Sequence, residues 1–197
     1  KEGFDPHLDL AKHAGVITQD DIDKHNSGER SLSSLRKNYK VVNYSATYGV
    51  GASTLSRNTG MPTKDAKKLL EAFWSRNWSV YKVASTARTR DLFGSTWLYN
   101  PVSQFWYSLR SDKDRFSTLN QGTGVFCFDS WVSLCRRYGI KTIGQFHDEI
   151  IALLPEGEEE QTKATMEQAI ENLNQKLELN VPLGVDAQFG KSYADIH

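Results

Sequence analysis

Two carboxylates and an imidazole stand together between two apolar runs, at His147, Asp148 and Glu149. The surrounding segment, Ile143–Leu154, reads IGQFHDEIIALL, and its flanks are rich in residues that favour strands. Because Asp and Glu are depleted in strands, the pattern predicts a β-hairpin with these three polar residues at its tip. Such a tip can hold a divalent cation against a phosphate. The alternative is an ordinary polar turn between two strands.

A second pattern repeats with a spacing of four, at Arg36, Lys40, Tyr44 and Tyr48. On a helix, side chains at this spacing lie along nearly one face. Two cations followed by two aromatic rings differ from a core stripe, which would be apolar throughout. The face can hold a polyphosphate at one end and a flat ring at the other, and Gly49 predicts where the helix ends. The alternative is a solvated amphipathic helix with a tyrosine packed inward.

These segments resemble motifs of the family A, or DNA polymerase I type, DNA polymerases. The helix is similar to motif B of the fingers, and Gln145–Glu149 is similar to motif C of the palm. Three further segments agree in order. Asp5-Pro6-His7 resembles the Asp-x-His element ahead of the fingers, and Asn120–Thr123 resembles the glutamine motif that opens the long palm helix. Val181–Leu183 and the terminal His197 resemble the way such polymerases end. The resemblance covers essentially all of the 197 residues.

The resemblance implies an α+β fold, with helical fingers and part of a palm whose antiparallel β-hairpin carries the metal-binding tip. Residues 1–29 would lead from palm to fingers, 30–115 would form the fingers, and 116–197 would form the C-terminal part of the palm. The Asp-x-Ser-x-x-Glu-Leu pattern of motif A does not occur in the sequence. We therefore expect the motif A aspartate, the thumb and any exonuclease domain to lie outside this chain, in an upstream segment or a split-gene partner chain.

The implied activity is template-directed DNA synthesis, the addition of deoxynucleotides to a primer 3′ end by two-metal phosphoryl transfer. Asp148 would be a ligand of the two Mg²⁺ ions, which it would share with the motif A aspartate. Glu149 would support water or metal. Lys40 would also be the candidate for protonating the pyrophosphate leaving group.

The resemblance also assigns the substrate contacts. Arg36, Lys40 and His7 would hold the triphosphate of a deoxynucleoside triphosphate, and Tyr44 would stack against its sugar and base. The expected contacts with primer-template DNA are Tyr48 near the nascent pair, His147 at the primer end, and Gln121 in the minor groove, where every correct pair offers similar acceptors.

The sequence departs from the family at three positions. Lys113 and Ser117 stand where many members have Arg and Asn, and Arg115 is the neighbour that could bind the primer or template strand instead. Tyr44 stands where many bacterial members have Phe. In this family a Tyr there accompanies weak rejection of dideoxynucleotides and favours a phage-like or organellar origin. An accessory processivity or helicase factor is a further expected partner, and a membrane is not.

The formal net charge of zero conceals a division along the chain. Between Arg30 and Arg90 there are twelve basic and two acidic residues, whereas from Gln145 to the end there are three basic and eleven acidic ones. The pattern predicts a positive fingers face and an acidic palm. Cys127 and Cys135 lie eight residues apart on a predicted helix, about 12 Å, so we expect two buried reduced thiols and an intracellular protein, bacterial, phage-related or organellar.

Hydrophobic periodicity and turn signals place the remaining elements. The predicted helices are 7–13, 18–24 with Thr18 as N-cap, 31–48, 63–77 with Thr63 as N-cap, 80–92 with Arg88 and Arg90, 116–138, and 158–178. An aromatic-rich irregular or β segment covers 94–107, and 181–185 is predicted to be a last strand. Other functions also remain open: a polymerase-derived non-catalytic DNA-binding module, an unrelated metal-dependent hydrolase, and a fragment inactive by itself.

Overall fold

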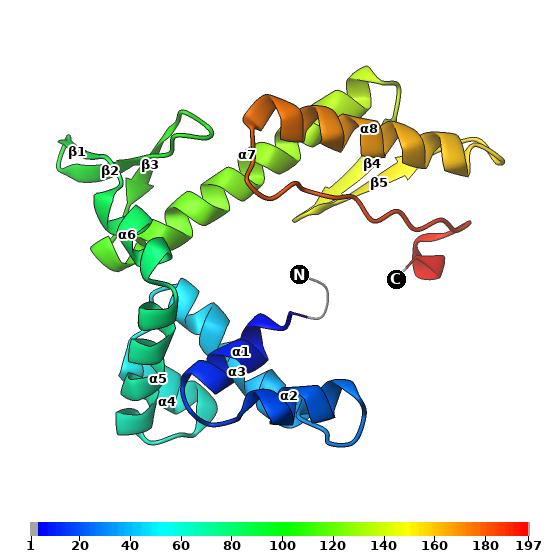
Figure 1. Cartoon of the computed structure of the whole chain (residues 1–197). Coiled ribbons are helices and arrows are strands. Elements are labelled where there is room, and N and C mark those ends of the chain that lie inside the picture. The colour runs from blue at the N-terminus through cyan, green and yellow to red at the C-terminus, as the bar shows by residue number, and fades with distance from the viewer. Residues whose placement is uncertain (1–3, 197) are drawn as a thin grey trace. The chain divides into compact units, whose positions relative to one another are not determined.

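The computed structural model describes residues 4–196 and confirms an α+β fold (Figure 1). The chain divides into two compact units. The first contains the chain up to Asn100 together with Phe105–Asn120, and the second contains Pro101–Gln104 and the chain from Gln121 onward. The predicted boundaries at 29/30 and 115/116 concern functional subdomains and stay predictions.

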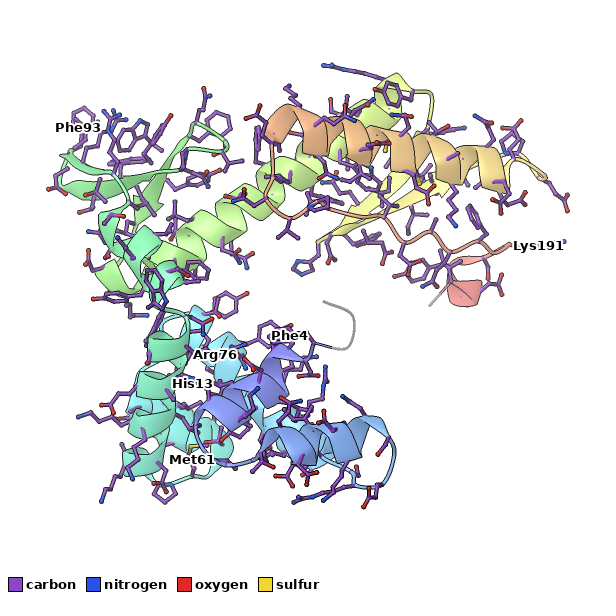
Figure 2. All side chains as sticks on the ribbon, in the orientation of Figure 1. Phe4, His13, Met61, Arg76, Phe93 and Lys191 are labelled. Carbon is purple, nitrogen blue, oxygen red and sulfur yellow. The ribbon has the colours of Figure 1, made fainter. Side chains whose placement is uncertain are left out.

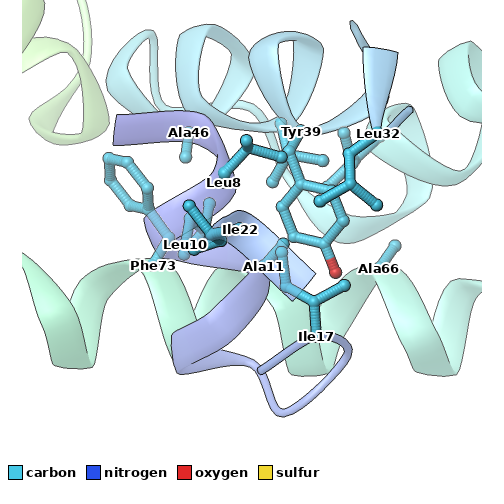
Figure 3. Close-up of a cluster of buried hydrophobic side chains, with 12 residues drawn as sticks. Leu8, Leu10, Ala11, Ile17, Ile22, Leu32, Tyr39, Ala46, Ala66 and Phe73 are labelled. Carbon is cyan, nitrogen blue, oxygen red and sulfur yellow. The ribbon is translucent and has the colours of Figure 1, made fainter. Parts of the chain in front are cut away.

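Five helices form the N-terminal part of the first unit. They are α1 (Pro6–His13), α2 (Gln19–Asn26), α3 (Ser33–Thr47), α4 (Ala52–Thr59) and α5 (Thr63–Arg76). The N-cap prediction for α2 is confirmed, because the Thr18 hydroxyl accepts from the Asp21 amide while the Asp21 carboxylate accepts from the Thr18 amide. Figure 3 shows the buried cluster between these helices, which includes Leu8, Leu10, Tyr39 and Phe73. This core fixes α1 against α3 and α5.

Helix α4 is not among the predicted helices, and the N-cap predicted for α5 is wrong. Pro62 occupies that position, so Thr63 is already helical and its hydroxyl donates instead to Ser56 Oγ. Leu55 explains why α4 forms, since its side chain is fully buried in the core and the left-handed Gly60 then ends the helix.

The helix predicted over 80–92 is confirmed only in its first part. Helix α6 (Trp78–Thr86) ends before Arg88, and the chain then forms an antiparallel sheet in the order β1 (Thr89–Leu92), β2 (Ser95–Tyr99) and β3 (Trp106–Leu109). This segment forms strands rather than continuing the helix, because the inner face of the sheet buries Leu98 and Leu109 in a small core. The expectation of a β-rich aromatic segment is confirmed.

The second unit is built on α7 (Arg115–Arg137), whose first residues belong to the first unit, and α8 (Glu159–Leu177). Between them lies the hairpin of β4 (Lys141–Phe146) and β5 (Glu149–Leu153). A buried cluster joins α7 to α8 through Trp131, Met166 and Leu173, and Trp131 Nε1 donates to the Met166 carbonyl at 3.1 Å. Residues of α8 at helical spacing face this core, as predicted.

The strand predicted over 181–185 does not form. Among the described residues this segment has no strand partner; instead the Leu183 amide and carbonyl both bond the side-chain amide of Asn174, at 2.8 Å each. Two short 3₁₀ helices, η1 (Asp112–Asp114) and η2 (Tyr193–Asp195), complete the structure. The predicted likeness of the chain end to polymerases involves His197, which lies outside the described residues.

Both cysteines are buried free thiols on α7, as predicted. Burial raises the pKa of the Cys135 thiol to about 11, so the protonated form dominates at neutral pH. No described helix is long and apolar enough to span a membrane.

Candidate nucleotide- and metal-binding sites

The cation–aromatic stripe lies on α3 and faces solvent. Lys40, Tyr44 and Tyr48 are exposed and Arg36 is half-exposed, whereas Tyr39 on the other side of the helix is buried. The tyrosine of this helix that packs inward is therefore Tyr39, which is not part of the stripe. The stripe is a surface available to a ligand rather than part of the core.

Asp5 links this surface to α1. Its Oδ1 caps α1 by accepting from the His7 amide at 2.8 Å and the Leu8 amide at 3.0 Å, and its Oδ2 accepts from Arg36 Nε. Burial tends to raise the pKa of Asp5, but the capping bonds and the Arg36 guanidinium outweigh it and hold the pKa below its ordinary value. Asp5 therefore stays ionised and orients Arg36. Sequence reasoning missed this role, although an Asp before Pro at a helix start is itself an N-cap signal.

His7 extends from α1 toward the middle of the stripe. Its ring centroid lies 6.2 Å from that of Tyr44, and Lys40 Nζ lies 5.8 Å from the same Tyr44 centroid. The structure thus brings His7, Lys40 and Tyr44 together, as the sequence predicted. The cluster therefore places an ammonium, an imidazole and a phenol group close to one another.

His7 is held neutral by its surroundings. Desolvation is the main cause of its lowered pKa, and the positive charges of Arg36, Lys40 and Arg76 add to it against the opposing effect of Asp5. Its Nδ1 is buried and has no hydrogen-bond partner among the described residues. His7 therefore offers a neutral ring, with one nitrogen still to be satisfied, beside the two cations of α3.

Gly49 ends α3 in the left-handed conformation, with φ +69°. A Cβ built there would lie 2.6 Å from the backbone oxygen of Lys113. Glycine is thus required twice at this position, for its backbone conformation and for the close approach of another backbone. The approach fixes the Tyr48 end of the stripe against η1.

The metal-binding candidates lie at the β4–β5 hairpin of the second unit. Phe146 pairs with Glu149, so the turn consists of His147 and Asp148 alone and Glu149 already belongs to β5; the predicted three-residue tip is corrected in this respect. His147 adopts a left-handed conformation with φ +48°, and both turn residues are exposed. Beside the turn, Gln145 Nε2 donates to Asp129 Oδ1 of α7 at 3.0 Å, a contact that the sequence did not indicate.

The donor atoms at this turn suit Mg²⁺ in kind. Mg²⁺ prefers carboxylate oxygens and keeps several waters, and Asp148 offers an exposed carboxylate with Glu149 directly after it. Among residues 4–196, no group of three or more His, Cys, Asp or Glu side chains gathers at a metal-binding distance. The described residues therefore fit a partial set of metal ligands.

Two of the four predicted DNA contacts, Gln121 and Arg115, lie on α7. Gln121 is exposed on this helix, within the second unit. Arg115, in the first unit, is already bound locally: its Nε and Nη2 donate to Asp112 Oδ1 at 2.9 and 2.8 Å, and its Nη1 lies 3.4 Å from the Ala87 carbonyl. A DNA phosphate would have to compete with these partners. Lys113 is paired with Asp114 in a similar way.

The chain is similar over most of its length to bacterial DNA polymerase I proteins. It is 28% identical to the thermostable DNA polymerase I of Thermus filiformis, over 82% of this chain and 21% of that protein. It is 27% identical to DNA polymerase I of Lactococcus lactis subsp. lactis, over 98% of this chain and 23% of that protein. The resemblance to DNA polymerase I is confirmed. The chain spans about a fifth of these relatives.

The fold agrees with this relationship. The POL domain of Pol1 from M. smegmatis, solved in complex with DNA primer-template and dNTP, superimposes with a TM-score of 0.71 at 18% identity, covering 98% of this chain and 35% of that one. DNA polymerase theta of Caenorhabditis elegans is a more distant relative, 25% identical over 80% of this chain and 10% of its own length. No protein-family model matches the chain.

Proposed function

We propose that the chain is the part of a DNA-directed DNA polymerase that binds the incoming nucleotide and contributes one metal-binding carboxylate. The observation that carries the proposal is the group formed by exposed Lys40 and Tyr44 of α3 with half-buried Arg36 and His7 of α3 and α1. Its chemistry matches a nucleoside triphosphate, with cations for the phosphates and a ring for the sugar and base. The similarity to DNA polymerase I over most of the chain supports the same function.

The α3 stripe explains how a triphosphate would be held. Lys40 is exposed and has no ion-pair partner among the described residues, so its ammonium is free to meet a phosphate oxygen. Arg36 is paired with Asp5, and a triphosphate would share or take over this guanidinium. Lys40 carries protons that it can donate to the pyrophosphate leaving group, while neutral His7 can donate or accept one hydrogen bond without adding charge.

The hairpin turn would hold Mg²⁺ through Asp148, with Glu149 binding a coordinated water or the metal itself. Bound Mg²⁺ would neutralise charge on the phosphates and on the primer oxygen. His147, the first residue of the turn, would contact the primer end. Gln121 would contact the minor groove of primer-template DNA, with Tyr48 near the new pair and Arg115 on a strand backbone.

We further propose that an upstream polymerase segment, or a split-gene partner chain, supplies the motif A aspartate and covers the hairpin. Among the described residues the sheet consists of β4 and β5 only, so each strand has one edge without a strand partner. Ile143, Phe146 and Leu153 are more than half exposed on this small sheet. An open edge beside exposed apolar side chains is suited to pairing with a further strand. In this arrangement residues 30–115 act as fingers and 116–197 as palm.

The test combines the chain with an upstream segment that carries motif A and measures primer extension with Mg²⁺. The Asp148→Asn variant should lose at least about 100-fold in kcat while primer-template affinity changes little, because a metal ligand acts mainly in the transition state. Glu156→Gln, which removes an exposed carboxylate from the loop after β5, is the matched control and should retain activity. Equal activity of Asp148→Asn and the control would refute the metal-binding role.

A further inference from the structure

The hairpin of the second unit departs from regular strand pairing shortly before its turn. It packs against α7 and α8 (Figure 1), and its side chains leave it on both faces (Figure 2). Thr142 pairs with Ala152 and Gly144 pairs with Ile151, so Ile143 is an extra residue in β4 and forms a β-bulge. One extra residue moves every later side chain of the strand to the other face. The bulge therefore decides which side chains near the turn face α7.

The side chain that the bulge directs toward α7 is that of Gln145. Thr142 pairs with Ala152, and Gln145 pairs with Ile150. Both partners pack against the core of the second unit, and paired residues lie on the same side of a sheet. Gln145 comes three residues after Thr142, so strict alternation would place the two on opposite faces. Because of the extra residue, Gln145 instead shares the core-facing side with Thr142.

Asp129 of α7 is the hydrogen-bond partner of Gln145 on this side. Asp129 Oδ1 accepts from Gln145 Nε2 at 3.0 Å. A carboxylate only accepts, whereas a side-chain amide offers two donors and an acceptor, so the bond also fixes which end of the amide faces α7. Both side chains are exposed, and water could satisfy them if they separated. The pair therefore adds little to the stability of the unit, and we looked for its role at the neighbouring turn.

The pair lies next to the turn that we propose binds a metal ion. A single further residue pair separates Gln145 from the turn residues His147 and Asp148. That pair includes Phe146, whose side chain alternates to the outer face and is more than half exposed. The bond from Gln145 to α7 thus holds the hairpin three residues before Asp148.

We propose that Asp129 is a positioning residue, which holds the Gln145 amide against α7 and thereby fixes the turn that presents Asp148 to a divalent cation. The inference rests on the proposed function, because it concerns the same turn. Mg²⁺ demands nearly ideal octahedral geometry, so its ligands must be held in place. A misplacement of about 1 Å can cost about 100-fold in rate. Asp129 itself contacts neither metal nor substrate in this arrangement.

The first experiment follows the turn in the 197-residue chain itself, by the heteronuclear ¹H–¹⁵N NOE of its backbone amides. Asp129→Ala should lower the NOE at His147 and Asp148, whereas Lys141 at the start of β4 should keep its value. Asp129→Asn retains an oxygen acceptor of the same shape, so it should preserve the NOE. The melting temperature of Asp129→Ala should fall by less than about 4 °C, because both bonded groups are exposed.

The second experiment measures primer extension by the chain combined with the upstream segment that carries motif A. Asp129→Ala should lower kcat at least about tenfold and raise the Mg²⁺ concentration for half-maximal rate, while the nucleotide KM changes less than about twofold. Gln145→Glu should be as damaging, because it places two carboxylates together. Adding Asp129→Asn should restore the rate, since the new amide can donate to the new carboxylate. Glu171→Ala, which removes an exposed carboxylate from α8, is the matched control and should keep its kcat.

Several outcomes would overturn the proposal: an unchanged NOE at the turn in Asp129→Ala, equal damage from Asp129→Asn and Asp129→Ala, or no rescue of Gln145→Glu by Asp129→Asn. A normal kcat for Asp129→Ala, in an enzyme that Asp148→Asn inactivates, would do the same. If Asp148→Asn is fully active while Asp129→Ala still loosens the turn, the metal-binding function fails instead, and the tie between Asp129 and the turn stands.

Discussion

Gly49 offers a stringent test of how α3 is held, because two separate costs can be worked out for a side chain there. Its φ of +69° is left-handed, a conformation that costs a residue with a Cβ about 1–2 kcal/mol. In addition, an alanine Cβ would lie 2.6 Å from Lys113 O, and since that atom belongs to the backbone, η1 or the end of α3 must shift. Forcing atoms into a packed site typically costs about 1–3 kcal/mol more. We therefore expect Gly49→Ala to lower the free energy of unfolding by about 2–5 kcal/mol.

Gly60 is the matched control. It ends α4 with φ +73°, but a Cβ there meets nothing within 4 Å, so Gly60→Ala should cost only the conformational part, about 1–2 kcal/mol. Asparagine tolerates the left-handed conformation better than alanine, so Gly60→Asn should be milder still. Gly49→Asn should remain costly, since it keeps the Cβ that clashes.

The assay is equilibrium urea unfolding followed by tryptophan fluorescence. Four of the five tryptophans belong to the first unit and Trp131 to the second, so the signal reports mainly on the unit that contains both glycines. A Gly49→Ala variant no less stable than Gly60→Ala would refute the close approach of Lys113. Equal costs for the two Asn variants would refute it independently.

Three further predictions concern the proposed nucleotide site. In the complete enzyme, Lys40→Ala should raise the nucleotide KM and lower kcat, and a normal KM would show that α3 does not face the triphosphate. Tyr44→Phe should raise the deoxy-over-dideoxy ratio of kcat/KM by the equivalent of about 1–3 kcal/mol, because Phe cannot replace the missing 3′-hydroxyl; an unmoved ratio would place Tyr44 elsewhere. By NMR, the pKa of His7 should lie below its ordinary value of 6.5. The unfolded chain then binds this proton more readily, so stability falls as pH drops below about 6.5, and His7→Gln should lessen that fall.

The elements that sequence predicted well are those whose signal is local. The period-four stripe of α3, the capping box at Thr18 and the apolar flanks of the hairpin each depend on residues a few positions apart. Local patterns of this kind report side-chain direction directly. They were sufficient to place Lys40 and Tyr44 on one exposed face.

The wrong predictions concern elements whose formation depends on contacts between residues far apart in the sequence. Residues 87–92 carry no strong strand signal, and β1 forms because β2 pairs with it and Arg90 stacks on Trp106, sixteen residues further on. The strand predicted over 181–185 fails for the complementary reason, because no described strand pairs with it. Strand preference depends on what the pleated surface packs against, and a window of sequence does not contain that information.

The candidate nucleotide site shows the same division between local and distant information. The cations and rings of α3 are specified by spacing within that helix, but their partners on α1, Asp5 and His7, are not. Asp5 can pair with Arg36 only because burial of Leu8 and Leu10 fixes α1 beside α3. The same packing desolvates His7 and keeps its ring neutral between two cations. The spacing of the motif residues thus predicts a ligand class, whereas the packing of α1 pairs Asp5 with Arg36 and lowers the pKa of His7.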